Sequence, residues 1–193
     1  RRVLFRSGKL LAEHFGGYLP VVVDVTDALE FGKENLIAVW ADNSNDPNYP
    51  PGKQQEVLDF TYFGGIYRDC WLIAHNQVFI TDPNYENEEA GGGLFIAYNN
   101  VSDHSAEVLL KIQIRNSGRK AFKGVVEYEL QQPDGQQVAS LNSVIRIKPG
   151  KSTYSSDKLT VKSPMLWSPE NPALYNLIVR IRDEKGNPID GYR

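Results

Sequence analysis

The sequence predicts an all-β protein built from two β-sandwich units. Apolar stretches of strand length recur along the 193 residues, and in the second half apolar and polar residues alternate as in half-buried strands. Helix-like spacing is confined to residues 26–30, enough for one turn capped by Thr26 or Asp27. Two polar stretches rich in proline or glycine, 42–55 and 82–93, predict a long surface loop and a unit boundary.

The first unit is assigned to residues 1–75. Residues 19–25 and 36–41 are apolar on both faces, which is typical of strands buried between two layers. A further strand is predicted at 66–73, after the 42–55 loop. Residues 1–7 begin basic and then turn apolar; we interpret them as a non-native remnant and leave them out of the fold prediction. Four or so strands with two apolar faces need an opposing layer, so we expect the chain to be a piece of a longer protein.

The second unit is assigned to residues 76–193. Strict alternation predicts strands at 107–114, 126–130, 145–147 and 175–182, each with one face toward a core and the other toward water. About seven strands in roughly 100 residues are typical of an immunoglobulin-like sandwich. The chain stops in what resembles mid-strand at 189–193, which adds to the expectation of a longer protein.

Charge and composition exclude several classes of partner. The formal net charge is −3, and the 21 Lys and Arg residues are scattered rather than clustered, so no nucleic-acid partner is expected. No apolar run approaches the ~20 residues of a membrane-spanning helix, so no membrane partner is expected. The single cysteine, Cys70, permits no intrachain disulfide and leaves the compartment open between cytoplasm and periplasm. Its apolar surroundings predict a buried, inert thiol.

Three segments, in this order, carry a family resemblance. They are residues 8–20 (GKLLAEHFGGYLP), 59–69 (DFTYFGGIYRD) and 166–175 (LWSPENPALY). The first two resemble the sugar-binding domain of glycoside hydrolase family 2, and the third is similar to the final-strand motif of that family's immunoglobulin-like domain. The resemblance covers residues 8–193. It implies that the first unit is the C-terminal part of a jelly-roll (galactose-binding-like) sandwich.

The resemblance also implies what the chain lacks. Family members carry a (β/α)₈ barrel whose two glutamates perform retaining hydrolysis, with carboxyl groups ~5–5.5 Å apart. This sequence shows no alternation of strands with helices, so we expect no catalytic residue in it. The implied partners are a β-galactoside or related oligosaccharide, bound through the complete enzyme, and the enzyme's own barrel; a homo-oligomer stays open.

Asp59 is the one candidate site residue. In the β-galactosidases of the family, an aspartate just before the Gly-Ile-Tyr-Arg strand lines the galactose subsite, near the primary hydroxyl of the sugar and a bound cation. Asp59 matches that position by its spacing to residues 65–68, which makes it a candidate substrate-binding residue. The alternative is an ordinary aspartate at the end of a loop. The resemblance implies no cofactor in this chain, and a monovalent or divalent cation in the complete enzyme.

Other residues have simpler interpretations. Arg68 is predicted to pair with a carboxylate or loop carbonyls. Trp167 is predicted to pack in a core or between domains rather than to stack on a sugar. Glu127 and Glu129 lie on one strand face and are interpreted as solvated surface. The three histidines, His14, His75 and His104, are too far apart in sequence to predict a metal site.

Three functions from different classes remain open. The leading hypothesis is a non-catalytic part of a retaining glycosidase that acts on terminal β-D-galactosides; a β-glucuronidase or β-mannosidase of the same family is its close variant. The second is a stand-alone carbohydrate-binding module, and the third is a structural or adhesion sandwich without a ligand. A neighbouring barrel sequence with two glutamates would favour the first.

Overall fold

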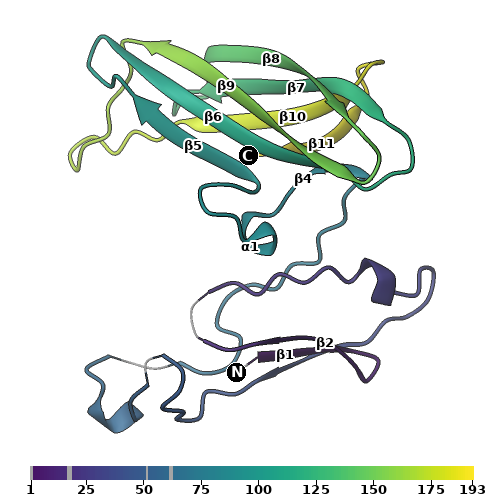
Figure 1. The fold of residues 1–193 in the computed structure, drawn as a ribbon. Helices are drawn as coiled ribbons and strands as arrows, with labels where there is room; N and C mark the ends of the chain where they lie inside the picture. The colour runs from purple at the N-terminus through teal and green to yellow at the C-terminus, as the bar shows by residue number, and fades with distance from the viewer. Residues whose placement is uncertain (1, 17–18, 51, 61–62) are drawn as a thin grey trace. The chain divides into compact units, whose positions relative to one another are not determined.

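The chain folds into two compact units, Arg1–Leu72 and Ile73–Arg193, which are described separately below (Figure 1). The computed structural model describes residues 2–16, 19–50, 52–60 and 63–193. The described helical segments are three short turns and the other regular elements are strands, so the all-β prediction is confirmed. None of the described helices is long and apolar enough to cross a membrane.

The first unit is built on one antiparallel sheet of three strands. Its strands are β1 (Arg2–Arg6), β2 (Lys9–His14) and β3 (Ile37–Ala41), in the order β2-β1-β3. Ser7 and Gly8 join β1 to β2 in a tight turn, and both have positive φ, 47° and 82°. Glycine adopts this conformation without steric cost, which explains Gly8 at this turn.

Arg6 fastens the end of β1 to the polypeptide before β3. Its guanidinium donates to Asn35 Oδ1 from Nε at 3.1 Å and from Nη2 at 2.9 Å, and it lies 3.0 Å from Glu30 Oε1. Hydrogen bonds from Lys33 and Arg6 lower the pKa of Glu30 below its ordinary value. Residues 1–7 were left out of the fold prediction, which was wrong: β1 is the central strand of this sheet.

Two predicted strands of the first unit are absent from the structure. Residues 19–25 and 66–73 run without strand pairing, whereas the predicted strand at 36–41 is confirmed as β3. An apolar run becomes a strand only when a neighbour accepts its backbone hydrogen bonds, and these two runs have none among the described residues. The predicted helical turn is confirmed as η1 (Thr26–Ala28), but Asp24 rather than Thr26 or Asp27 supplies its side-chain bond, accepting from Thr26 N at 2.9 Å.

The described part of the first unit buries very little apolar surface. Val3 is the only apolar residue of this part that is buried, and large side chains on both faces of β3 stay exposed. Because apolar burial supplies most of the free energy of folding, such a sheet is weakly stabilised until another layer covers it. These exposed side chains agree with the expectation that the sheet of the first unit has an uncovered apolar face.

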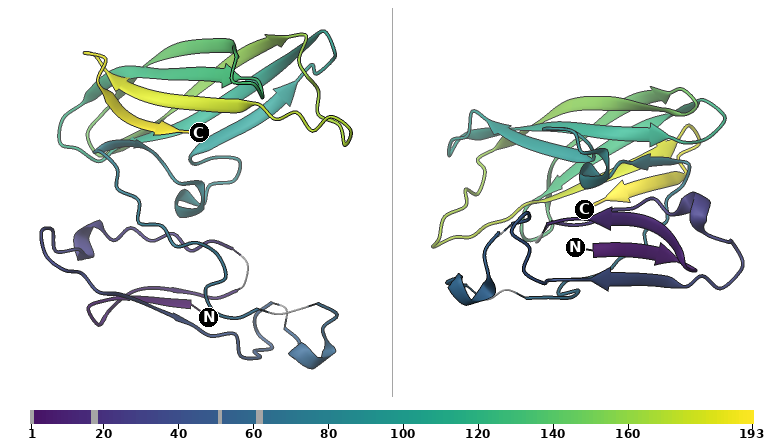
Figure 2. Two further views of the ribbon diagram at one scale, coloured as in Figure 1. Left: turned by 180° about the vertical axis from the view of Figure 1, so that it is seen from behind. Right: turned by 60° about the horizontal axis from the view of Figure 1, so that its bottom comes forward.

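The second unit is a sandwich of two four-stranded sheets (Figures 1 and 2). One sheet has the order β11-β10-β7-β8. In the other, β6 pairs with β4, β5 and β9. The strands are β4 (Val78–Ile80), β5 (Leu94–Asn99), β6 (Ser105–Asn116), β7 (Phe122–Gln131), β8 (Gln137–Ile147), β9 (Lys151–Lys162), β10 (Asn176–Asp183) and β11 (Pro188–Tyr192).

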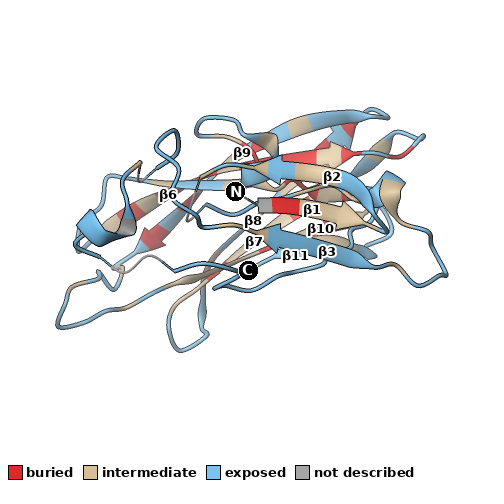
Figure 3. Ribbon diagram, turned by 90° about the horizontal axis from the view of Figure 1, so that it is seen from below, coloured by how far each residue is buried: buried red, intermediate tan, exposed pale blue. Residues whose placement is uncertain are grey.

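Alternation builds the core of this sandwich. On β6 and β7 every second residue is buried, and Figure 3 shows the buried positions recurring along the strands. The fully enclosed side chains are Tyr128, Leu110, Ile112, Ile114, Ile181, Val126, Val179 and Asn116. The alternating segments predicted from the sequence coincide with parts of β6, β7, β8 and β10. A strand that is covered by a core on one face alternates apolar and polar residues.

The outward faces of β7 and β10 carry ordered ion pairs. Arg180 Nη1 lies 2.8 Å from Glu129 Oε2, and Arg182 Nε lies 2.8 Å from Glu127 Oε2. The bond from Arg180 lowers the pKa of Glu129. The two glutamates are thus half-buried members of cross-strand pairs, not free carboxylates available for acid–base chemistry.

A strap of residues 82–93 covers part of the outer face of β6 and β9. Within it, α1 (Pro83–Glu86) is capped by Asp82, whose Oδ1 accepts from Asn84 N and Tyr85 N. Glu88 accepts hydrogen bonds from the Tyr154 hydroxyl and from Gln113 Nε2. The bond from Tyr154 lowers the pKa of Glu88, and the same bond raises the pKa of Tyr154.

Candidate functional site

Asp59 lies in an irregular segment of the first unit, just after the turn η2 (Gln55–Val57). Its carboxylate is exposed and makes no hydrogen bond or ion pair with another described residue. Two aromatic residues that follow Asp59 in the sequence, Phe60 and Phe63, also have exposed side chains. Thr61 and Tyr62, which belong to the family-like motif, lie outside the described residues.

The two glycines after Asp59 bring its segment against the 42–55 loop. A Cβ added to Gly64 would fall 2.5 Å from Asn43 Nδ2, so a larger residue there would require the exposed Asn43 side chain to move. Gly65 follows with φ +75°, a conformation that other residues adopt at a cost. Gly65 therefore has a local structural role that its backbone conformation sets.

An exposed carboxylate followed in sequence by two exposed aromatic side chains can contact a sugar, but a single carboxylate cannot hydrolyse one. Carboxylate oxygens accept hydrogen bonds from hydroxyl groups, and aromatic faces pack against apolar sugar faces. Retaining hydrolysis needs two carboxyl groups across one sugar, and no such pair surrounds Asp59 among the described residues. The described residues also contain no group of three His, Cys, Asp or Glu that could hold a metal ion.

Three other sequence interpretations meet a different environment. Cys70 is exposed, so the prediction of a buried thiol was wrong; the segment around it lacks the covering layer that would bury it. Arg68 is also exposed and bonds to no described residue, against the predicted pairing. Trp167 is more than half exposed in the 163–175 loop of the second unit, so it does not belong to the core, and its packing between domains stays a prediction.

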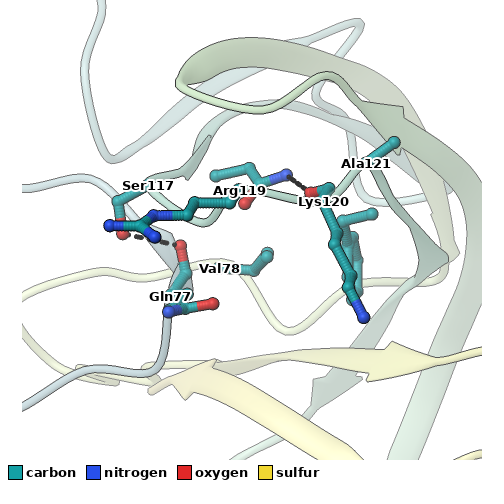
Figure 4. A pocket seen from close by; sticks show the side chains of 8 residues that line it. Gln77, Val78, Ser117, Arg119, Lys120 and Ala121 are labelled. Carbon is teal, nitrogen blue, oxygen red and sulfur yellow. Dashed lines mark hydrogen bonds between the residues drawn. The ribbon is translucent and has the colours of Figure 1, made fainter.

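A pocket in the second unit lies where the chain enters the sandwich (Figure 4). It has a volume of about 700 Å³ and is lined by Gln77, Val78, Asn116, Ser117, Arg119, Lys120, Ala121 and Phe122. Ser117 N donates to Gln77 O at 2.8 Å, which holds the entering chain against the β6–β7 turn. No carboxylate lines the pocket, so it offers no acid–base pair either.

The fold defines the chain as an all-β protein of two units, in which a small, sparsely buried sheet is followed by a complete two-sheet sandwich. Residues 93–193, more than half of the chain, match the model of the glycosyl hydrolases family 2. The chain belongs to this family.

Relatives with two activities match the chain over nearly its whole length. A β-glucuronidase of Bacteroides fragilis is 29% identical over 97% of the chain, and a β-galactosidase of Thermoanaerobacter pseudethanolicus is 28% identical over 98%. The crystal structure of Bacteroides uniformis β-glucuronidase superposes on 99% of the chain with a TM-score of 0.85 and 30% identity.

The chain spans only a small part of these relatives. It covers 26% of the B. fragilis protein, 23% of the T. pseudethanolicus protein and 22% of the B. uniformis chain. The match runs through both units of this chain, including the part of the first unit that carries Asp59. Most of each relative therefore lies outside the region that corresponds to this chain.

Proposed function

We propose that this chain forms two supporting, non-catalytic units of a retaining glycoside hydrolase. The observation that carries the proposal is the end-to-end match with glycosidases of which the chain spans about a quarter. The exposed carboxylate and the absence of a carboxylate pair around it, within the described residues, support a role in shaping a sugar site rather than in bond cleavage. The hydrolytic pair would then belong to a barrel domain of the same polypeptide.

For the sugar, we propose a terminal β-D-galactoside. The support is Asp59, whose place before the Gly-Ile-Tyr-Arg segment fits a carboxylate that accepts a hydrogen bond from the primary hydroxyl of galactose. A cation shared between this carboxylate and the sugar is part of the same proposal, because hard cations prefer oxygen ligands. Asp59 would contribute one oxygen ligand to such an ion.

A β-glucuronide is the second candidate, favoured by the names of several relatives. A glucuronide carries a carboxylate where galactose has its primary hydroxyl. Two carboxylates at hydrogen-bonding distance repel one another unless a proton or cation lies between them. As a direct hydrogen-bond acceptor from the primary hydroxyl, Asp59 therefore favours the galactoside over the glucuronide, whereas a shared cation would accommodate either sugar.

The test is a comparison of two substrates with the complete polypeptide encoded by the gene. Nitrophenyl β-galactoside and nitrophenyl β-glucuronide would be assayed side by side, and the proposal expects a higher kcat/KM for the galactoside. A higher kcat/KM for the glucuronide would replace the galactoside assignment while keeping the glycosidase. Sugar binding without hydrolysis of either substrate would favour a carbohydrate-binding module instead.

A further inference from the structure

One end of the second unit gathers positive charge from two separate parts of the sequence. Seven of the 21 Lys and Arg residues of the chain lie in residues 115–123 and 146–151, and neither stretch contains Asp or Glu. The formal net charge of the whole chain is −3, so overall composition does not explain this concentration of cations. The cations appear scattered along the sequence because β7 and most of β8 separate the two stretches.

Strand pairing and one buried amide hold the two stretches together. Asn116 pairs with Lys151 where β6 ends and β9 begins. Asn116 is 1% exposed, and its Nδ2 donates to Lys120 O at 2.8 Å and to Ile147 O at 3.2 Å. The β6–β7 turn and the β8–β9 turn therefore lie at the same end of the sandwich.

Five of the seven cations have no acidic partner among the described residues. Arg115 Nη2 lies 2.8 Å from Glu86 Oε2, and Lys123 forms an ion pair with Glu184. The five others are exposed; they are Arg119, Lys120, Arg146, Lys148 and Lys151, which we call the basic end. Arg146 also lies directly opposite Lys123 in the β7–β8 pair, and like charges so placed destabilise a sheet. An anionic ligand would relieve this repulsion.

The pocket of about 700 Å³ described above adjoins the basic end. Arg119 and Lys120 line it, and Figure 4 shows their side chains extending from the β6–β7 turn in different directions. The side-chain amide of Gln77 also lines the pocket and can donate a hydrogen bond to an oxyanion. An anionic group in this pocket would meet two cations and no carboxylate.

The chemistry of this surface distinguishes among anionic partners. None of the large apolar side chains that are exposed lies in residues 115–123 or 146–151, and the one aromatic residue there, Phe122, is only partly exposed. Single-stranded nucleic acids stack their bases on aromatic side chains, and helices that bind membrane surfaces insert apolar side chains among the lipids. An acidic polysaccharide requires neither, because its charges lie on a polar chain.

We propose that the basic end binds an acidic polysaccharide, with one carboxylate or sulfate group of the polymer in the pocket. The choice of a glycan over other polyanions rests on the proposed function, since a glycosidase acts on glycans. No carboxylate lines the pocket, so the basic end would bind the polymer and not cleave it. Salt screens charges at a surface, so this binding weakens as ionic strength rises.

Binding measurements with charged and neutral polysaccharides test this proposal. Dextran sulfate supplies sulfate groups, alginate supplies carboxylates, and dextran is the uncharged control. The complete polypeptide encoded by the gene should bind at least one of the acidic polymers, more weakly at higher salt, and should not bind dextran. The acidic polymer that binds more tightly identifies the anionic group that the pocket prefers.

Lys151→Glu and Lys162→Glu are a matched pair of variants. The two lysines are the first and last residues of β9, both are exposed, and neither forms an ion pair with a described residue. Lys151→Glu should raise Kd for the acidic polymer about tenfold or more, because a cation that contacts the polymer becomes an anion. Lys162→Glu changes the net charge equally and should raise Kd less than about twofold. Arg119→Ala should also raise Kd, and the thermal midpoint of all three variants should match that of the unaltered protein.

Several results would overturn the inference. Equal weakening by the two lysine variants would assign binding to net charge alone. Tighter binding of duplex DNA or of anionic lipid vesicles would assign the basic end to another partner. Binding by the 193-residue chain but not by the complete polypeptide would mean that other parts of the polypeptide cover the basic end.

Hydrolysis of the two nitrophenyl glycosides is measured separately on the same protein. An active polypeptide that binds no acidic polymer rejects this inference alone. A polypeptide that binds one but hydrolyses neither nitrophenyl glycoside rejects the proposed function alone.

Discussion

Asp59 is the residue on which the sugar assignment depends. Its side chain is exposed and bonds to no other described residue, so it contributes little to the stability of the first unit. A substitution at such a residue should not disturb the fold. Its effect on sugar binding can therefore be measured apart from any effect on stability. In the motif that follows Asp59, the positive φ of Gly65 accounts for that glycine, whereas the carboxylate itself makes no bond to a described residue.

Asp59→Asn in the complete enzyme should therefore weaken binding and leave stability unchanged. The amide keeps the size of the side chain but loses the negative charge, and a hydrogen bond to a charged group contributes ~1.5–3 kcal/mol. We expect KM for nitrophenyl β-galactoside to rise about tenfold or more, with an unaltered thermal midpoint. Steady-state kinetics and thermal unfolding check this. Unchanged kinetics would remove Asp59 from the site.

Asp157, in contrast to Asp59, has a structural role. It accepts a hydrogen bond from Ser143 of β8, on the opposing sheet, and one from Ser155 at 2.6 Å on its own strand. The hydroxyl of Tyr128 is buried beside these groups without a hydrogen bond of normal geometry, and burial raises its pKa. The carboxylate thus joins the two sheets.

Asp157→Ala should destabilise the second unit by ~1–3 kcal/mol, because two partly buried hydroxyls lose their acceptor. Tyr128→Phe is the control, since it removes an equally central oxygen that has no such bond, and its cost should stay below ~1 kcal/mol. Denaturant unfolding of the chain measures both. Equal costs for the two variants would contradict the role assigned to Asp157.

At the scale of elements, the strap 82–93 shows how one glycine can fix a whole segment. Gly93 has φ +56°, and a Cβ added there would lie 2.7 Å from Pro83 Cδ and 2.9 Å from Thr81 O. Its N–H donates to Thr81 Oγ1 at 2.8 Å, in a buried position. The strap therefore returns to β5 along a path that only glycine permits.

Gly93→Ala should destabilise the second unit by more than the ~1 kcal/mol of a strained backbone conformation, because backbone atoms must also move. Gly135→Ala is the matched comparison: its φ is +87°, but nothing lies within 4 Å of the added Cβ. We expect the first variant to cost ~2–4 kcal/mol and the second ~1 kcal/mol in denaturant unfolding. Similar costs would mean that the strap adjusts freely.

The elements also show what the sequence could and could not predict. Strands β6, β7 and β10 were predictable because one covered face imposes alternation on their own residues. Residues 66–73 were predicted as a strand because they are apolar, but a strand also needs a partner, and that information is not local. The hydrogen bonds between the strap and β9 could not be predicted for the same reason, since Glu88 and Tyr154 are 66 residues apart in the sequence. Asp59 was found through its spacing to a motif, and its exposure came only from the structure.

At the scale of the whole molecule, the two units differ in how much they bury. The second unit has a continuous core, whereas Val3 is the one buried apolar residue in the described part of the first. Local opening follows local burial, so the first unit should open more readily. Limited proteolysis of the chain should cut residues 1–72 first and leave a product that begins near Ile73. Early cleavage within β6 to β10 would contradict this order.

The central claim is that these two units support a sugar site but do not carry the hydrolytic groups. The most direct test is to incubate the purified 193-residue chain with nitrophenyl β-galactoside and nitrophenyl β-glucuronide at high protein concentration. The account predicts no release of nitrophenol above the uncatalysed rate from either substrate. Turnover that scales with the concentration of the chain would contradict it.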